Sequence, residues 1–181
     1  LRDTDDAQAS LESRLAALDT GLVPDLITLR SLRATYAYAQ GEITRADALF
    51  RGQAALAERG GLPRDHPALI EDQLRHAELL GATGKPRESK ERFEEALRHA
   101  GQRFGEDSTR AQRIREKLAT ALFAWRKLPA AASLAQEIRE RDSRHPERPA
   151  RGPLLSLLEG NLALLRGQNV EAETDFTEAA Q

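Results

Sequence analysis

The amino-acid sequence predicts an all-α protein, a right-handed superhelix of about nine stacked helices. Three observations predict this fold. A pattern of glycine, alanine and a bulky apolar residue returns about every 42 residues, prolines stand where helices are expected to begin, and the composition is rich in helix-favouring Ala, Leu, Arg and Glu. Such a period indicates supersecondary units that each bury an apolar face against their neighbours.

The repeat is defined by four turn positions that lie 43, 42 and 41 residues apart: Gly41, Gly84, Arg126 and Gly167. In the clearest copies an alanine follows the turn after five residues and a phenylalanine after nine. A small residue stands seven positions before every turn: Ala34, Ala77, Ala119 and Gly160. Small residues at fixed places allow two antiparallel helices to approach closely, so each repeat is expected to be a helix–turn–helix.

Prolines and a capping residue mark where the expected helices begin. The first expected helix, 5–18, supplies the trailing helix of a preceding unit. Later starts are marked by prolines, which the first helical turn tolerates: Pro24, Pro67, Pro86, Pro129 and Pro153. Ser108 is the expected N-cap of the helix at 108–125.

Glycines mark where helices are expected to stop, at Gly60, Gly101 and Gly105. The stretch 142–149 has two prolines and is the expected hinge or loop. We therefore expect helices at 5–18, 24–40, 43–59, 67–82, 86–103, 108–125, 129–141, 153–166 and 169–180. They belong to a single array over 1–181, in which residues 1–20 precede helix pairs at 24–60, 67–103, 108–141 and 153–181.

The third unit carries the repeat pattern best, in residues 118–123 followed by Leu128, Ala131, Leu134 and Ile138. This pattern resembles the tetratricopeptide repeat (TPR), over roughly residues 24–181. The 42-residue period and the His-Pro pairs at 66–67 and 145–146 are similar to the longer repeats of the kinesin-light-chain type. Because the sequence begins without methionine, we also expect it to be a fragment of a longer protein.

Composition argues against several other classes of function. The chain has 27 basic and 29 acidic residues, so no net positive charge favours nucleic acid or an anionic membrane. No apolar run approaches the ~20 residues of a membrane-spanning helix. The four histidines have no chelating spacing, cysteine is absent, and Gly84-Lys85 lacks the hydroxyl residue of a phosphate-binding loop. We expect no catalysis, no metal and no cofactor, and a cytoplasmic location.

The resemblance implies that the first helices of successive units line a concave, peptide-binding groove. By position in the repeat, its lining comprises Ser31, Thr35, Tyr38, Leu74, Glu78, Glu116, Thr120, Phe123, Leu157, Asn161 and Leu164. Tyr38 and Phe123 are the candidate aromatic contacts, and the two glutamates favour a basic partner segment. The alternative is that Leu157 and Leu164 belong to the core and that both aromatic residues pack against adjacent helices.

The leading hypothesis is a protein-interaction module that binds a peptide or partner domain without catalysis. A second hypothesis is the sensory or regulatory arm of a multidomain bacterial signalling protein, such as a kinase or a transcription regulator. A third is an oligomerisation element that stacks end to end into a homo-oligomer through open terminal helices, which repeat arrays otherwise cover with polar caps.

Overall fold

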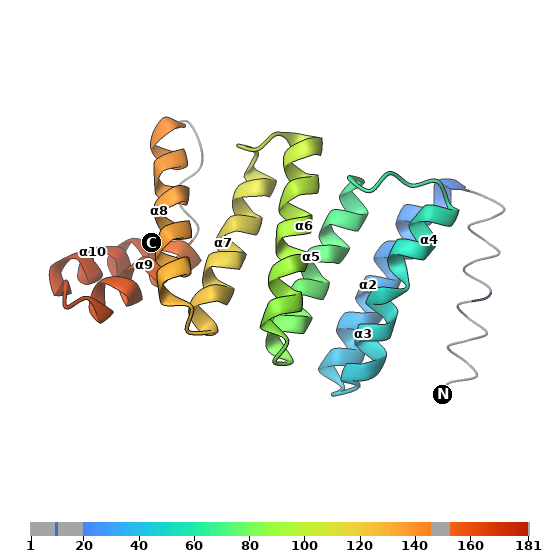
Figure 1. The fold of residues 1–181 in the computed structure, drawn as a ribbon, viewed down its shortest axis with the longest axis horizontal. Coiled ribbons are helices and arrows are strands. Elements are labelled where there is room, and N and C mark those ends of the chain that lie inside the picture. Colours follow the sequence, from blue (N-terminus) through green and yellow to red (C-terminus); the bar gives the residue numbers. More distant parts are fainter. Residues whose placement is uncertain (1–9, 11–19, 146–152, 181) are drawn as a thin grey trace. The chain divides into compact units, whose positions relative to one another are not determined.

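The computed structural model describes residue 10, residues 20–145 and residues 153–180, and these contain helices and turns but no strand. A short 3₁₀ turn, Thr20–Leu22, precedes the α-helices (Figure 1). The α-helices are α2 (Val23–Ala39), α3 (Ile43–Arg51), α4 (Gln53–Arg59), α5 (Pro67–Ala82), α6 (Pro86–Phe104), α7 (Thr109–Ala124), α8 (Leu128–Arg144), α9 (Pro153–Leu165) and α10 (Asn169–Ala179). Apart from residue 10, the expected helix at 5–18 falls outside the described residues.

The expected helix starts are confirmed to within about a residue, and the turn explains why the repeat recurs. All four turn residues have a left-handed backbone, with φ between 60° and 79°. Glycine adopts that conformation without steric cost, whereas Arg126, at φ 60°, does so against the preference of an L-residue. Ser108 caps α7 as expected, because its side chain accepts a hydrogen bond from the Ala111 N–H at 3.2 Å.

Three expected helix limits are wrong. Gly101 does not stop a helix but is buried inside α6, which ends instead before Gly105 at φ 93°. The expected helix at 43–59 is divided at Gly52, whose backbone is nevertheless helical. The expected loop at 142–149 starts too early, because α8 continues through Arg144.

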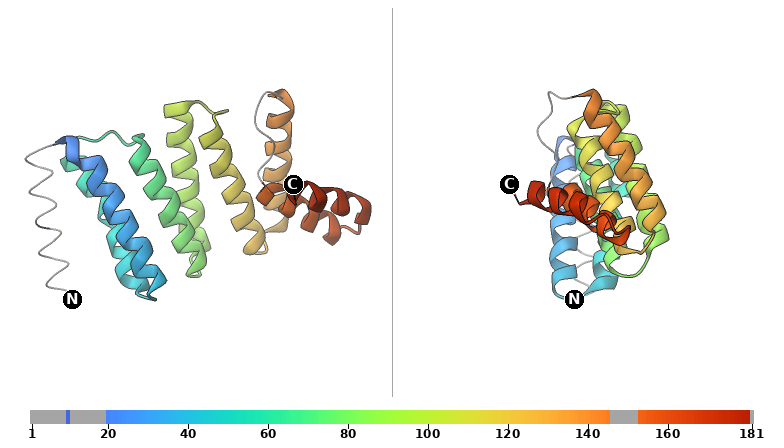
Figure 2. Two further views of the ribbon diagram at one scale, coloured as in Figure 1. Left: turned by 180° about the vertical axis from the view of Figure 1, so that it is seen from behind. Right: turned by 90° about the vertical axis from the view of Figure 1, so that its left-hand side faces the viewer.

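The chain divides into two compact units, unit 1 (Leu1–Arg103) and unit 2 (Phe104–Gln181). Within unit 1, α2 packs against α3 and α5. Within unit 2, α9 packs against α7, α8 and α10, and the α9–α10 pair runs across the other two helices (Figures 1 and 2). The continuity of one array across the division stays a prediction.

The small residues of the repeat lie where helices meet. Ala34 and Ala77 in unit 1 and Ala119 in unit 2 have no solvent exposure. Among the described residues of unit 1, one cluster of the apolar core lies around Ile27 and Leu56, and another lies around Phe50. In unit 2 one cluster joins three helices: Ala119 of α7, Ala135 and Ile138 of α8, and Leu155, Leu158 and Leu162 of α9.

Polar groups are also buried at the helix seams of unit 1. Ser31 of α2 donates a hydrogen bond to Asp72 of α5, and Gln53 of α4 donates one to the Ile27 carbonyl oxygen at 3.0 Å. Burial raises the pKa of Asp72 to about 7, although Ser31 and Gln53 oppose that rise. This seam therefore places an acid of unusual pKa between helices that belong to successive repeats.

A second polar cluster of unit 1 joins α3, α5 and the turn before α6. Asp47 accepts hydrogen bonds from His76 at 2.8 Å, from Lys85 at 3.1 Å and from Arg51 at 3.1 Å. The His76 ring also stacks on Phe50, with 5.1 Å between ring centres. Burial raises the pKa of Asp47, but these hydrogen bonds outweigh that effect and lower the pKa to about 2. The cluster ties α5 and the turn before α6 to α3 through one carboxylate, and its four residues include no nucleophile.

Candidate binding face

The groove residues expected in unit 1 divide into surface and core. Thr35, Tyr38 and Glu78 are exposed, and Tyr38 retains 38% of its accessible area. Ser31 and Leu74 are each 3% exposed, so the expectation that they line an open surface is wrong. Their helices, α2 and α5, are in direct contact, and Ser31 is buried there against Asp72 of α5. Only part of the expected surface is therefore present in unit 1.

In unit 2 the expected residues of α7 share one face and are all partly accessible. Glu116, Thr120 and Phe123 are half-buried, and their spacing of four and three residues places them along one side of the helix. Phe123 packs with part of its ring against the core cluster of unit 2. Thr120 uses its hydroxyl locally, donating to the Glu116 carbonyl oxygen at 2.9 Å. Phe123 and the Glu116 carboxylate are therefore the groups that this face presents.

The expected residues of α9 are more exposed than those of α7. Leu157 is 47% and Leu164 is 48% exposed, while their neighbours Leu155, Leu158 and Leu162 are buried. Asn161 lies between the exposed leucines and donates to the Leu157 carbonyl oxygen at 2.7 Å. The two exposed leucines are thus surface residues, and the core alternative does not apply to them. We call these three residues of α9 and the three of α7 the α7–α9 face.

Two polar residues that sequence reasoning missed adjoin Glu116. Gln112 lies one turn before Glu116 on α7, and its Nε2 donates to Asp142 Oδ1 of α8 at 3.1 Å. Burial and the nearby Asp142 charge both raise the pKa of Glu116. The four-residue spacing of Gln112 and Glu116 was visible in the sequence. The approach of Asp142 was not, because it depends on how α8 packs against α7.

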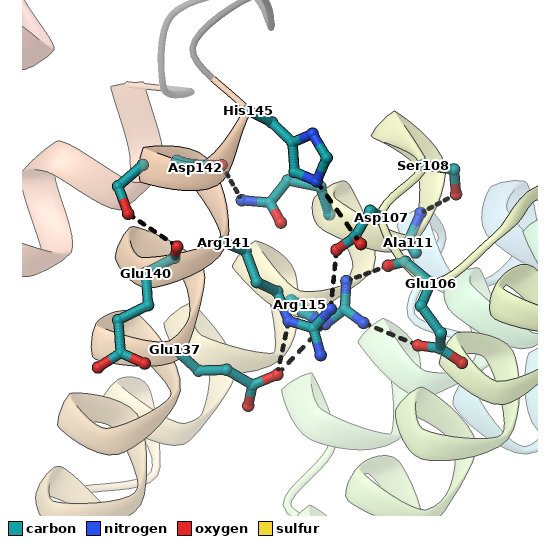
Figure 3. A network of polar contacts seen from close by, with 12 residues as sticks. Glu106, Asp107, Ser108, Ala111, Arg115, Glu137, Glu140, Arg141, Asp142 and His145 are labelled. Atoms are coloured by element: carbon teal, nitrogen blue, oxygen red, sulfur yellow. Dashed lines mark hydrogen bonds and ion pairs between the residues drawn. The ribbon is translucent and has the colours of Figure 1, made fainter.

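Beside this group, buried Arg115 ties the turn before α7 to α8 (Figure 3). Arg115 is 2% exposed and donates to the Glu106 carbonyl oxygen at 2.7 Å and to the Glu106 carboxylate at 2.9 Å. Arg141 of α8 bonds Asp107 at 2.8 Å and Glu137 at 3.0 Å. The guanidinium groups of this network are therefore directed at Glu106, Asp107 and Glu137.

The described part of the chain holds no cluster of metal-binding side chains. Among these residues, no group of three or more His, Cys, Asp or Glu side chains is placed to hold a metal ion. Their helices also include none long and apolar enough to cross a membrane. The accessible chemistry of the α7–α9 face consists of one carboxylate, one aromatic ring and two leucines, which are groups suited to binding.

Comparison with solved structures identifies the fold. BtubC (BKLC) from P. vanneervenii superposes with a TM-score of 0.72 over 99% of this chain and 73% of its own, at 16% sequence identity. Two crystal structures of a putative kinesin light chain of Podosopora anserina, with nearly identical TPR-like repeats, superpose with TM-scores of 0.67 and 0.66. They cover 86% and 96% of this chain, and 74% and 93% of their own, at 18% and 16% identity.

The chain has the fold of TPR-like repeat proteins. No family model matches its sequence, and no curated protein does either. At such identities the likeness concerns the backbone fold alone.

Proposed function

We propose that this chain is a protein-interaction module without catalytic activity and that it binds a peptide segment of a partner protein on the α7–α9 face. One observation carries the proposal. Phe123, Leu157 and Leu164 remain partly or largely exposed on α7 and α9, beside a core cluster that these two helices share with α8. Exposed aromatic and leucine side chains on rigid helices bury large area at small entropic cost, which is typical of binding surfaces.

A peptide library displayed on phage tests this proposal with the full chain as bait. We expect selected peptides to bind the unaltered chain and to lose affinity by about tenfold or more with Phe123→Ser or Leu157→Ser. Val170→Ser is the matched control, because Val170 of α10 is apolar, 81% exposed and outside this face. Circular dichroism confirms that each variant is folded. Selected peptides that bind all three variants equally would contradict the proposal.

A second candidate function, self-association, is favoured by the outer surface of the α9–α10 pair. A shallow hollow there is lined mainly by Leu164, Ala172, Phe176 and Ala180. Sedimentation measures this possibility directly, because association through α10 makes the apparent mass rise with concentration. Leu164→Asp, which places a charge in this hollow, is expected to abolish such a rise. A constant mass at millimolar concentration would remove this candidate.

A further inference from the structure

A pocket of about 280 Å³ lies in unit 1, where α4, the loop that follows it, α5 and α6 meet. We call it the His99 pocket, after the histidine of α6 that lines it. Sites for small molecules commonly measure about 300–1,000 Å³, so this volume is at the lower end and suits a single side chain. The α7–α9 face contributes no residue to it, because every lining residue belongs to unit 1.

The walls of the His99 pocket are apolar and are supported by the core. Ala57 of α4 and Leu69 of α5 are buried and belong to the core cluster around Ile27 and Leu56. Leu62 of the loop is half-buried and packs against the same cluster. These side chains offer only carbon atoms, so an occupant has to present an apolar surface to them.

His99 adds one hydrogen-bond acceptor to these walls. The ring is 5% exposed, and its Nδ1 lies 3.1 Å from Gln73 Oε1. Because that oxygen can only accept, Nδ1 carries the proton, and Nε2 of the neutral ring is then an acceptor. Burial, the largest influence, lowers the pKa of His99 and so favours the neutral ring.

The Nε2 acceptor of His99 is available to an occupant. It makes no hydrogen bond with another described residue, yet it is not one of the unpartnered atoms that are closed to solvent. His99 is buried apart from the small area that lines the pocket, so a donor placed there can reach this nitrogen. The pocket therefore combines carbon walls with a single free acceptor.

The charged residues of the His99 pocket lie at its more exposed edge and have both signs. Glu58 and Arg64 are exposed, and Glu95 is half-buried and accepts a hydrogen bond from Arg92 at 2.7 Å. A cation among the carbon walls would lose its water for one neutral acceptor, which is costly. An anion would meet the acceptor and two carboxylates. The pocket therefore favours a neutral group that carries a hydrogen-bond donor.

We propose that the His99 pocket binds a tyrosine side chain of a partner protein, with the phenol O–H donating to His99 Nε2. Tyrosine combines an apolar ring with a donor at its far end, so the ring covers the walls while the hydroxyl reaches the histidine. Water donates to Nε2 but leaves the walls uncovered, and phenylalanine covers the walls but leaves Nε2 without a donor. The site goes beyond the proposed function, because it requires no residue of the α7–α9 face.

The N-acetyl amides of tyrosine, phenylalanine, tryptophan and lysine test this assignment by NMR titration of the full chain. We expect the tyrosine amide to bind in the millimolar range and to shift the His99 Nε2 signal, because its hydroxyl donates there. The phenylalanine amide should bind about threefold to tenfold more weakly, which is the range for one net hydrogen bond. His99→Leu should abolish this preference, because leucine has no acceptor.

A second pair of variants tests the pocket without altering its histidine. Ala54→Phe is expected to fill the pocket and abolish binding of the tyrosine amide, because Ala54 is an exposed residue that lines it. Ala55→Phe is the matched control, since Ala55 is exposed on the same helix and does not line the pocket, and it should retain binding. Circular dichroism confirms that each variant is folded.

Several results would overturn the inference. They are no saturable binding of the tyrosine amide, equal binding of the tyrosine and phenylalanine amides, and binding that survives Ala54→Phe. Tighter binding of the tryptophan or lysine amide would replace tyrosine as the occupant and so contradict the assignment. All of these measurements concern unit 1, so their failure leaves the proposed function of the α7–α9 face to its own test.

Discussion

Asp72 gives the sharpest physical prediction for this chain, because a carboxyl group is buried between helices of unit 1. It is 5% exposed, accepts a hydrogen bond from Ser31, and contacts the amide of Gln53, whose Oε1 is buried without a donor. A buried carboxyl is costly to ionise away from water, so Asp72 keeps its proton to a higher pH than an exposed aspartate does. The perturbation that isolates this effect is Asp72→Asn, because asparagine has the same shape, stays uncharged and carries an N–H donor.

The magnitude follows from the pKa, which rises from 3.8 to about 7 on folding because of burial. One pKa unit corresponds to 1.36 kcal/mol, so the rise is equivalent to about 4 kcal/mol. The folded state holds its proton where the unfolded state has released it. The stabilising contribution is therefore fully present below pH 3.8 and is lost as the pH rises through about 7. Asp72→Asn removes this loss and should stabilise unit 1 by a few kcal/mol at pH 8.

Carbon-detected NMR titration of the Asp72 carboxyl measures its midpoint directly. Urea unfolding between pH 4 and pH 8 then compares the unaltered chain with Asp72→Asn, and Asp25→Asn serves as the control for removing an exposed aspartate. We expect the stability difference caused by Asp72→Asn to grow with pH, and that caused by Asp25→Asn to stay small. An Asp72 midpoint near 4, together with parallel stability curves, would refute the argument.

Three further predictions concern packing and turns. Ala119→Arg and Ala131→Arg each place a charged side chain at a site with no solvent exposure, so the free energy of unfolding should fall by several kcal/mol. Thermal melting measures this loss, and a melting temperature within about 2 °C of the parent would contradict the repeat alignment. Gly60→Ala puts a methyl group 2.3 Å from Val23 Cγ2 in the core, so urea unfolding should show a loss of about 1–3 kcal/mol in the free energy of unfolding. Gly52→Ala places its methyl group against the end of the Arg30 side chain, which can shift, and should lower the free energy of unfolding by less. Arg126→Gly should raise stability by about 1 kcal/mol because it relieves a left-handed residue, and Arg126→Ala, which keeps the strain, should not.

Repeat spacing allowed most of the backbone to be predicted, because each signal is local. A proline in the first turn of α5 and a glycine with positive φ at Gly84 act through their own dihedral angles. Ala77, between them, is buried as its repeat position implies. Gly101 misled the prediction because glycine is only permitted, not required, to end a helix, and here it lies in a buried helical position.

The candidate site was predicted less completely, because exposure depends on what lies across a seam. Leu74 and Glu78 lie one turn apart on α5, yet the first is core and the second is surface. Ser31 is covered because it meets Asp72, which lies 41 residues away in sequence. Asp142 reaches Gln112 only because α8 returns antiparallel to α7. Distances between helices decide these contacts, and a spacing pattern within one helix does not contain them.

The position four residues before each small residue separates this chain from the TPR pattern, which has tryptophan there. The chain has polar residues at all four places: Arg30, Gln73, Arg115 and Ser156. Gln73 pairs with His99 of α6 at 3.1 Å, whereas Arg115 pairs with Glu106 before its own helix. A tryptophan packs against any well-shaped apolar neighbour, but a buried polar group requires one particular partner. Because the partner of Gln73 lies on the next helix and that of Arg115 precedes its own helix, the second and third repeats are not interchangeable at this position.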